Sequence, residues 1–313
     1  MELSTHNRFF ELARMGTLRL SGWPARLYPF FAILYGLVAP LFASAIVSIP
    51  LAVLLFLMGT GQSGVVTLMS SSSGLAALLI VSFGPIFILV WAWLRLFEKR
   101  PLWSIGLERQ GWLLKYLRGA VWGIVMIAIA VGIPAVFGYL QVEEVESRIW
   151  VVSTSALVLL LGWMVQGAAE EVLFRGFLFQ IIGVRMGLFS GILVSSVLFA
   201  LLHIFNGKNI GWLALVNLTL FAVFAVLYAL REGGLWGIFA LHTTWNWAQA
   251  NLFGMEVSGL PFHLTPALNL KEVGPDWVTG GAFGPEGGLA VTLVLFAGLL
   301  ALLFFWRDKP GRE

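Results

Sequence analysis

The chain has 313 residues, of which 59% are hydrophobic and only 11% are charged. Soluble domains carry about 25% charged residues, so this composition excludes a soluble globular protein and predicts an all-α, polytopic helix bundle in a membrane. The net charge of +3 does not indicate a nucleic-acid partner, because the basic residues lie in short runs beside apolar segments, where they set topology. The chain has no cysteine, which excludes disulfides, thiolate chemistry and cysteine-ligated metals.

The first part of the chain is expected to hold a polar tail and three membrane spans. Residues 1–26 are basic and have no apolar run, which predicts a cytoplasmic N-terminal tail. Residues 27–149 contain three apolar stretches, which predict three transmembrane helices, the first of them uncleaved and kinked at Pro40 and Pro50. The Gly/Ser-rich segment 60–73 predicts a loop between the first two helices.

The strongest basic cluster lies between the second and third expected helices and includes Lys99 and Arg100. Trp103 and Trp112 in the same stretch predict an interfacial segment, with the indole rings at headgroup depth. About eight spans with both termini in the cytoplasm satisfy the positive-inside rule for the whole chain. We therefore expect an integral protein of a prokaryotic-type plasma membrane.

The second part of the chain holds four apolar stretches within residues 150–253, followed by a Gly/Pro-rich segment, 254–286, that predicts one long loop. Residues 287–313 predict the last transmembrane helix and a basic tail. The first of the four stretches, 150–183, is longer than the about 20 residues of a perpendicular crossing. A tilted or broken helix, or a re-entrant piece hinged at Gly167, is therefore expected there.

Three charged residues interrupt this long apolar stretch: Glu170, Glu171 and Arg175. Burial of an ionised group without partners costs several kcal/mol, so charges inside a membrane segment are rare and usually functional. On a helix, Glu171 and Arg175 are four positions apart with the acid first, which is the favourable order for an ion pair. The pairing leaves Glu170, about 100° round the helix, as the carboxylate available for chemistry.

Two further polar motifs stand in apolar surroundings. His203 follows Phe199 by four positions, and His242 precedes Asn246 by four, so each pair shares one helix face. A lone buried histidine is more often a packing residue than a catalyst, and a lone HxxxN pattern is weak. The motifs taken together are stronger evidence for a functional site, because they place most of the intramembrane titratable groups of the chain in one stretch.

The spacing of these residues predicts a single site. Glu170 and His203 each lie about 16 positions from a turn near Val184–Gly187, so two antiparallel helices place both side chains roughly 24 Å from the turn. A carboxylate and an imidazole that face each other can polarise a water between them, as general-base attack on an amide requires. His242 and Asn246 can donate hydrogen bonds to the oxyanion that develops on the scissile carbonyl.

Taken together and in this order, the motifs resemble those of the CAAX-protease and bacteriocin-processing (CPBP) family of intramembrane proteases, which includes the Ras-converting prenyl endopeptidase. The matching patterns are Glu170-Glu171-x-x-x-Arg175, Phe199-x-x-x-His203 and His242-x-x-x-Asn246. They cover the predicted helix core at residues 150–253, whereas the flanking spans carry no signature.

The resemblance implies an intramembrane endopeptidase that cleaves a membrane-anchored or lipidated peptide or protein. In that family picture, Glu170 and His203 activate the hydrolytic water, and His242 and Asn246 form the oxyanion site. Glu171, locked by Arg175, and Phe199 would support them. The family has been described both as metalloproteases and as metal-independent glutamate proteases. Glu170, His203 and His242 could ligate zinc, so a zinc enzyme is one alternative. The chain has no HExxH pair, however. The sequence therefore favours hydrolysis that requires no cofactor.

Two other functions are compatible with parts of the sequence. Ser63 lies in a GxSG string typical of rhomboid-like serine proteases, but the surrounding Gly/Ser-rich composition explains it, and the HxxxN motif follows the serine instead of preceding it. Alternatively, the protein is non-hydrolytic, either a proton-coupled transporter or an immunity or scaffold factor on the same fold. Intramembrane Glu and His also build proton relays, but the paired broken spans of a transporter are missing from the sequence.

Overall fold

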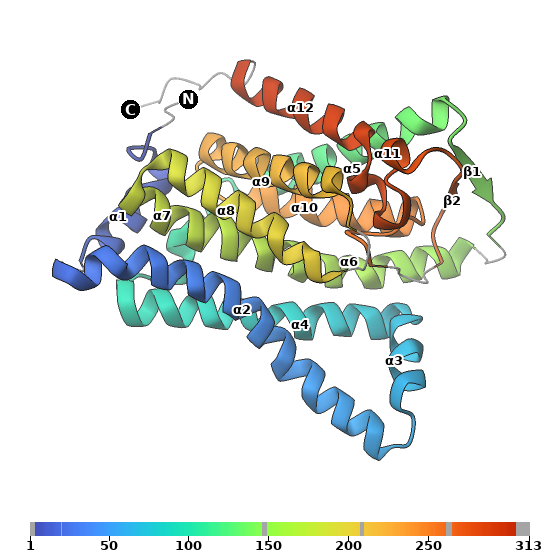
Figure 1. Cartoon of the computed structure of the whole chain (residues 1–313), viewed down its shortest axis with the longest axis horizontal. Helices are drawn as coiled ribbons and strands as arrows, with labels where there is room; N and C mark the ends of the chain where they lie inside the picture. The colour runs from blue at the N-terminus through green and yellow to red at the C-terminus, as the bar shows by residue number, and fades with distance from the viewer. Residues whose placement is uncertain (1–3, 20, 146–148, 207–209, 261–264, 305–313) are drawn as a thin grey trace.

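The computed structural model shows one helical bundle with a small two-stranded sheet at one end (Figure 1). It describes residues 4–19, 21–145, 149–206, 210–260 and 265–304, and within these ranges the side chains of residues 23, 24, 62, 149 and 150 are not described. The loop histidine His263 and the basic tail after Phe304 lie outside the described residues.

The described elements follow the order of the predicted spans, with additional short helices between them. The α-helices are α1 (Glu11–Thr17), α2 (Gly22–Leu57), α3 (Gly61–Met69), α4 (Ser72–Trp93), α5 (Trp112–Val136), α6 (Ile149–Glu171), α7 (Phe179–Met186), α8 (Leu188–Leu202), α9 (Trp212–Glu232), α10 (Trp236–Trp247), α11 (Asp276–Thr279) and α12 (Leu289–Phe304). Strands β1 (Leu140–Glu143) and β2 (Asn269–Glu272) pair antiparallel. Single turns of π-helix extend α4, α6 and α10 over Leu94–Glu98, Val172–Leu178 and Ala248–Leu252.

The all-α membrane architecture that the composition predicts is confirmed. Six helical segments of the described chain are long and apolar enough to cross a membrane, which makes this an integral membrane protein. The two other expected spans are shorter in the structure. Helix α10 has 12 residues before its π-helical turn, and α12 has 16 residues where the described chain ends.

The N-terminal segment is folded onto the bundle, which the prediction of a free tail did not anticipate. Phe9 and Phe10 are buried, and the ring of Phe10 lies 5.0 Å from that of Phe179 in α7. Asn7 caps this segment by accepting a hydrogen bond from the backbone N–H of Phe9 and donates one to the carbonyl of Leu230 in α9. Apolar residues at positions 9 and 10 therefore anchor a segment whose overall composition is polar.

Part of the basic cluster after α4 is also buried instead of lying at the membrane surface. Arg100 forms an ion pair with Glu98, and its guanidinium donates to Gln180 of α7 at 3.1 Å. Glu98 in turn accepts from the hydroxyl of Tyr28 in α2 at 2.8 Å. Since a buried charge is stable only with partners, this network ties α2, α4 and α7 together at one end of the bundle.

Helix α2 diverges from α4 along its second half, and α3 connects their separated ends (Figure 1). Prolines 29, 40 and 50 lie inside α2, and each removes one backbone hydrogen bond from the helix. The segment 60–73, which we predicted to be a loop, contains α3 instead. Ser63 of the GxSG string is exposed on this helix, where its hydroxyl donates to the carbonyl of Thr60 at 2.6 Å.

The long stretch 150–183 forms one interrupted helix, as its length predicts, but the interruption is not at Gly167. Helix α6 continues through Gly167 to Glu171, and the π-helical turn Val172–Leu178 separates it from α7. Every residue of that turn is buried. π-helical turns inside α-helices frequently occur at functional sites, and this one carries Arg175.

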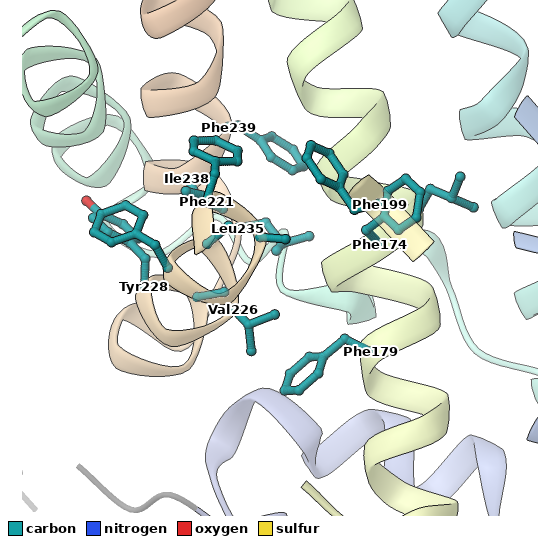
Figure 2. Packing of buried hydrophobic residues seen from close by; sticks show 14 of the residues in the cluster. Phe174, Phe179, Phe199, Phe221, Val226, Tyr228, Leu235, Ile238 and Phe239 are labelled. Carbon is teal, nitrogen blue, oxygen red and sulfur yellow. The ribbon is translucent and has the colours of Figure 1, made fainter. Parts of the chain in front are cut away.

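Helices α5 and α10 approach each other closely through glycines. A Cβ atom added at Gly119 would lie 1.9 Å from the carbonyl oxygen of Gly237, and one added at Gly123 would lie 2.3 Å from that of Leu241. Ile238 and Phe239 of α10 belong to the same buried cluster as Phe221 of α9 (Figure 2). The glycine contact therefore fixes the position of α10, the helix that carries His242 and Asn246.

Gly119→Ala is expected to lower the free energy of unfolding by about 1–3 kcal/mol, because the added methyl group forces α5 and α10 apart. Gly132→Ala in the same helix is the matched control, since no atom lies within 4 Å of the added Cβ. Thermal unfolding of both variants in detergent micelles measures the difference. Equal stability of the two variants would contradict the close approach.

Candidate active site

The four residues predicted to carry catalysis line one cavity of about 360 Å³. Glu170 lies at the end of α6, His203 directly follows α8, and His242 and Asn246 lie on α10. Phe199 lines the same cavity, whereas Ser63 does not. The structure therefore brings together residues that are up to 76 positions apart in the sequence, between Glu170 and Asn246.

Glu171 lies beneath this cavity as a fully buried carboxylate with two cationic or polar partners. Its Oε2 is 3.1 Å from Nε of Arg175, which confirms the predicted i,i+4 ion pair. Its Oε1 accepts a hydrogen bond of 2.8 Å from Nδ1 of His242. The second contact was not predicted, because it depends on how α10 is rotated against α6. Glu171 thus connects the π-helical turn to the site histidine.

Arg175 is buried beside aromatic rings as well as beside Glu171. The centre of its guanidinium lies 4.5 Å from the ring centroid of Phe199, a geometry in which a cation is attracted to the face of the ring. The rings of Phe174 and Phe199 are 5.2 Å apart and nearly perpendicular; Figure 2 shows the two side chains close together. Phe199 also contacts the ring of His203, 4.7 Å away. The supporting role predicted for Phe199 therefore has a structural basis in packing.

Glu170 has one oxygen engaged and one without a hydrogen-bond partner among the described residues. Its Oε1 accepts a bond of 2.8 Å from Nε2 of Gln166, and its Oε2 lies 3.8 Å from Nε2 of His242. Gln166 also accepts a bond of 3.0 Å from Nδ2 of Asn246. The glutamine therefore holds both the carboxylate and the amide, and it leaves Oε2 of Glu170 with capacity to accept a further hydrogen bond.

His203 occupies the cavity wall without touching Glu170. Its Nδ1 donates to the carbonyl of Phe199 at 2.8 Å, which leaves Nε2 as the nitrogen for the cavity. Within the described chain, Glu170 makes an ion-pair contact with His242 and none with His203. We predicted that the carboxylate of Glu170 and the imidazole of His203 share a water. Because the two side chains form no ion pair, that water would have to lie in the cavity between them.

Three residues with contacts in the site were not singled out from the sequence. Gln166 is four positions before Glu170 on the same helix face, a spacing that could have identified it. Ser258 and Glu286 come from the predicted long loop and also line the cavity. No sequence pattern marks these two residues, because their positions depend on how the loop folds back between α10 and α12.

Glu170, His203 and His242 are the residues that would hold a zinc ion if one were bound. Among the described residues, no three His, Asp or Glu side chains, these included, are grouped so that they could hold one metal ion.

Arg175→Met is expected to lower the free energy of unfolding by about 3–5 kcal/mol, because it leaves Glu171 as a buried charge without its cation. The double variant Arg175→Met/Glu171→Gln should recover part of this loss, since the uncompensated charge is gone. Chemical denaturation in micelles measures both. The exposed Arg109→Met is the control, and a loss for Arg175→Met no larger than for this control would refute the assignment.

A comparison with known protein families supports the predicted resemblance. Residues 152–248 match the family described as type II CAAX prenyl endopeptidase Rce1-like. The match begins in α6 and ends just after α10, so it includes all four predicted catalytic residues. No curated protein and no solved structure is significantly similar to the chain. Residues 152–248, about a third of this integral membrane protein, therefore match an Rce1-like domain.

Proposed function

We propose that the protein is an intramembrane endopeptidase that hydrolyses a peptide bond in a membrane-anchored or lipidated substrate. The observation that carries this proposal is the convergence of Glu170, His203, His242 and Asn246 on one cavity within an apolar bundle. The remaining lining is largely apolar and includes residues of α2, α4, α9 and α12 as well as of α6, α8 and α10, so it suits a substrate that carries lipid or apolar side chains. The matching family supports the same class of substrate.

In the proposed mechanism, Glu170 is the general base. Its unpartnered Oε2 takes a proton from a water, which His203 helps to orient, and the water oxygen attacks the scissile carbonyl carbon. The carbonyl oxygen becomes an oxyanion as the tetrahedral intermediate forms. The C–N bond then breaks, and the proton held by Glu170 passes to the leaving amine nitrogen. Atoms and charge balance without a covalent enzyme intermediate.

His242 and Asn246 are proposed to stabilise the oxyanion. Asn246 has one amide hydrogen engaged with Gln166, and its second remains for the substrate. His242 donates from Nδ1 to Glu171, so Nε2 is the nitrogen available to the cavity, and it donates when the ring carries both protons. Because these donors are fixed before substrate binds, they need little reorganisation during the reaction.

Glu170→Gln is expected to lower kcat about 10²- to 10⁴-fold, the usual contribution of a positioned general base. The substitution keeps the shape of the side chain and can retain the contact with Gln166. The assay is hydrolysis of a farnesylated peptide, with three residues after the modified cysteine, in phospholipid vesicles. Unaltered turnover would eliminate Glu170 as the base, whereas absence of hydrolysis by the wild-type protein would favour the non-hydrolytic alternative.

Two controls accompany this assay. Ser63→Ala should leave hydrolysis unchanged, because Ser63 is exposed on α3 and does not line the cavity; a loss here would favour the serine-protease alternative. Treatment with 1,10-phenanthroline, a metal chelator, should keep the rate of hydrolysis within about twofold of that of the untreated protein, since the described residues offer no three-ligand metal group. Inhibition that added zinc reverses would overturn the metal-free mechanism.

A further inference from the structure

A second carboxylate lines the cavity, and the proposed mechanism does not use it. Glu286 lies in the short 3₁₀ turn Pro285–Gly287, immediately before α12, and its residue surface is only 8% exposed. It shares the cavity lining with Glu170 and His203. A buried carboxylate in an apolar bundle is costly unless hydrogen bonds satisfy it, so its partners show which of its oxygens is already occupied.

The two carboxylate oxygens of Glu286 are unequally satisfied. Oε2 accepts from the backbone N–H of Ser258 at 2.5 Å and from Nε2 of Gln249 at 3.3 Å, and it lies 3.0 Å from the hydroxyl of Ser258. Among the described residues, Oε1 has only that same hydroxyl, 3.2 Å away. A hydroxyl has one hydrogen and a carboxylate oxygen has two lone pairs. Oε1 therefore keeps capacity to accept a further hydrogen bond.

The backbone around Glu286 is held rigidly in place. Nδ2 of Asn217 in α9 donates to the carbonyls of Glu286 at 2.8 Å and of Gly288 at 2.9 Å. Ser258 adopts a left-handed backbone conformation with φ of 51°, which is strained for a residue with a side chain and persists only where its surroundings hold it. Its carbonyl accepts from Asn206 at 3.3 Å, three positions after His203. The carboxylate is thus preorganised beside the His203 end of the cavity.

Electrostatics agree with this placement. Burial, the largest effect, raises the pKa of Glu286, whereas the hydrogen bonds from Ser258 and the nearby His203 act to lower it. Glu286 and His203 also line the same cavity. A substrate group bound at Glu286 would therefore share that cavity with the predicted catalytic residues.

A peptide substrate needs such an acceptor. Inside a membrane bundle, each backbone N–H of an extended substrate that loses water must find another partner, or it costs several kcal/mol. Of the two carboxylates in the cavity lining, Glu170 is committed to the attacking water. Glu286 offers the other acceptor, and the hydrogen bonds that its Oε2 receives from Ser258 and Gln249 favour the ionised form, whose hydrogen bonds are stronger than those between neutral groups.

We propose that Glu286 is a substrate-binding residue whose Oε1 accepts a main-chain N–H of the peptide substrate beside the scissile bond. The inference rests on the proposed hydrolytic function and adds to it a specificity determinant presented by the loop between α10 and α12. In this proposal, the loop between α10 and α12 forms part of the substrate-binding site and does not merely cover the cavity.

The test is a comparison of Glu286→Gln with the matched variant Glu256→Gln. In Glu286→Gln, the amide oxygen can still accept from Ser258, so the NH₂ group takes the place of Oε1 and presents a donor to the substrate. KM should rise about tenfold or more, as loss of a buried hydrogen bond to a charged group requires, while kcat stays within about threefold. Glu256 lies in the same loop outside the cavity lining, and its substitution should change neither constant.

Ester-containing substrates identify which backbone N–H of the peptide donates a hydrogen bond to Glu286. In a series of farnesylated peptides, each has one backbone N–H replaced by an ester oxygen. The wild-type protein should lose affinity for one member, and Glu286→Gln should show no further loss for that member, because the partner is already missing. The assignment would be overturned if Glu286→Gln lowered kcat and left KM unchanged. It would also be overturned if the wild type and Glu286→Gln lost affinity equally for every ester.

Binding measurements separate this inference from the proposed hydrolysis. In protein that already carries Glu170→Gln, addition of Glu286→Gln should weaken binding of the fluorescently labelled peptide in vesicles about tenfold. If the wild type hydrolyses no substrate, the proposed function fails, and if Glu170→Gln turns over substrate as the wild type does, the role of Glu170 as the base fails. If Glu170→Gln is inactive but the second substitution leaves both Kd and KM unchanged, only the role of Glu286 fails.

Discussion

The buried carboxylate of Glu171 is the interaction on which the site depends. A charge at this depth is tolerated only with partners, and Glu171 has two that come from different elements. Arg175 lies in the π-helical turn that follows α6, and His242 lies on α10. A single carboxylate therefore sets the orientation of the site histidine and fixes two helices against each other. Removal of either partner would leave the other contact insufficient to offset the cost of burial.

A row of polar contacts extends this constraint along the interface between α6 and α10. Gln166 bonds to Asn246, and Glu170 lies near His242, so successive turns of the two helices are matched. On the opposite side of α10, the glycine contact with α5 leaves no room for the helix to move away. The cavity therefore has one wall of fixed polar groups, which preorganises it for chemistry on a peptide bond.

Much of this could be predicted from the sequence, because it depends on local periodicity. The apolar stretches predicted the helical membrane bundle, and the four-residue spacing predicted the pair of Glu171 and Arg175. The conjunction of motifs also predicted that Glu170, His203, His242 and Asn246 line one cavity. Their catalytic roles stay predictions, as do the cytoplasmic location of the termini and the type of membrane.

Other features depend on tertiary contacts that no short pattern encodes. The bond from His242 to Glu171 requires a particular rotation of α10, and the polar N-terminal segment is anchored by contacts of Phe9, Phe10 and Asn7 with distant helices. The break in the long helix is a π-helical turn that begins after Glu171 instead of a hinge at Gly167. Ser258 and Glu286 reach the cavity because a Gly/Pro-rich segment folds back over it, although its composition indicates only a loop.

The most direct test of the account is the coupling energy between Glu171 and His242 in a double-mutant cycle. The free energy of unfolding would be measured in micelles for Glu171→Gln, His242→Phe and the double variant. We predict that the effects are non-additive by about 1 kcal/mol or more, as expected for residues that share a buried network. Additive effects, within about 0.5 kcal/mol, would show that the two side chains do not act together and would contradict the central role of Glu171.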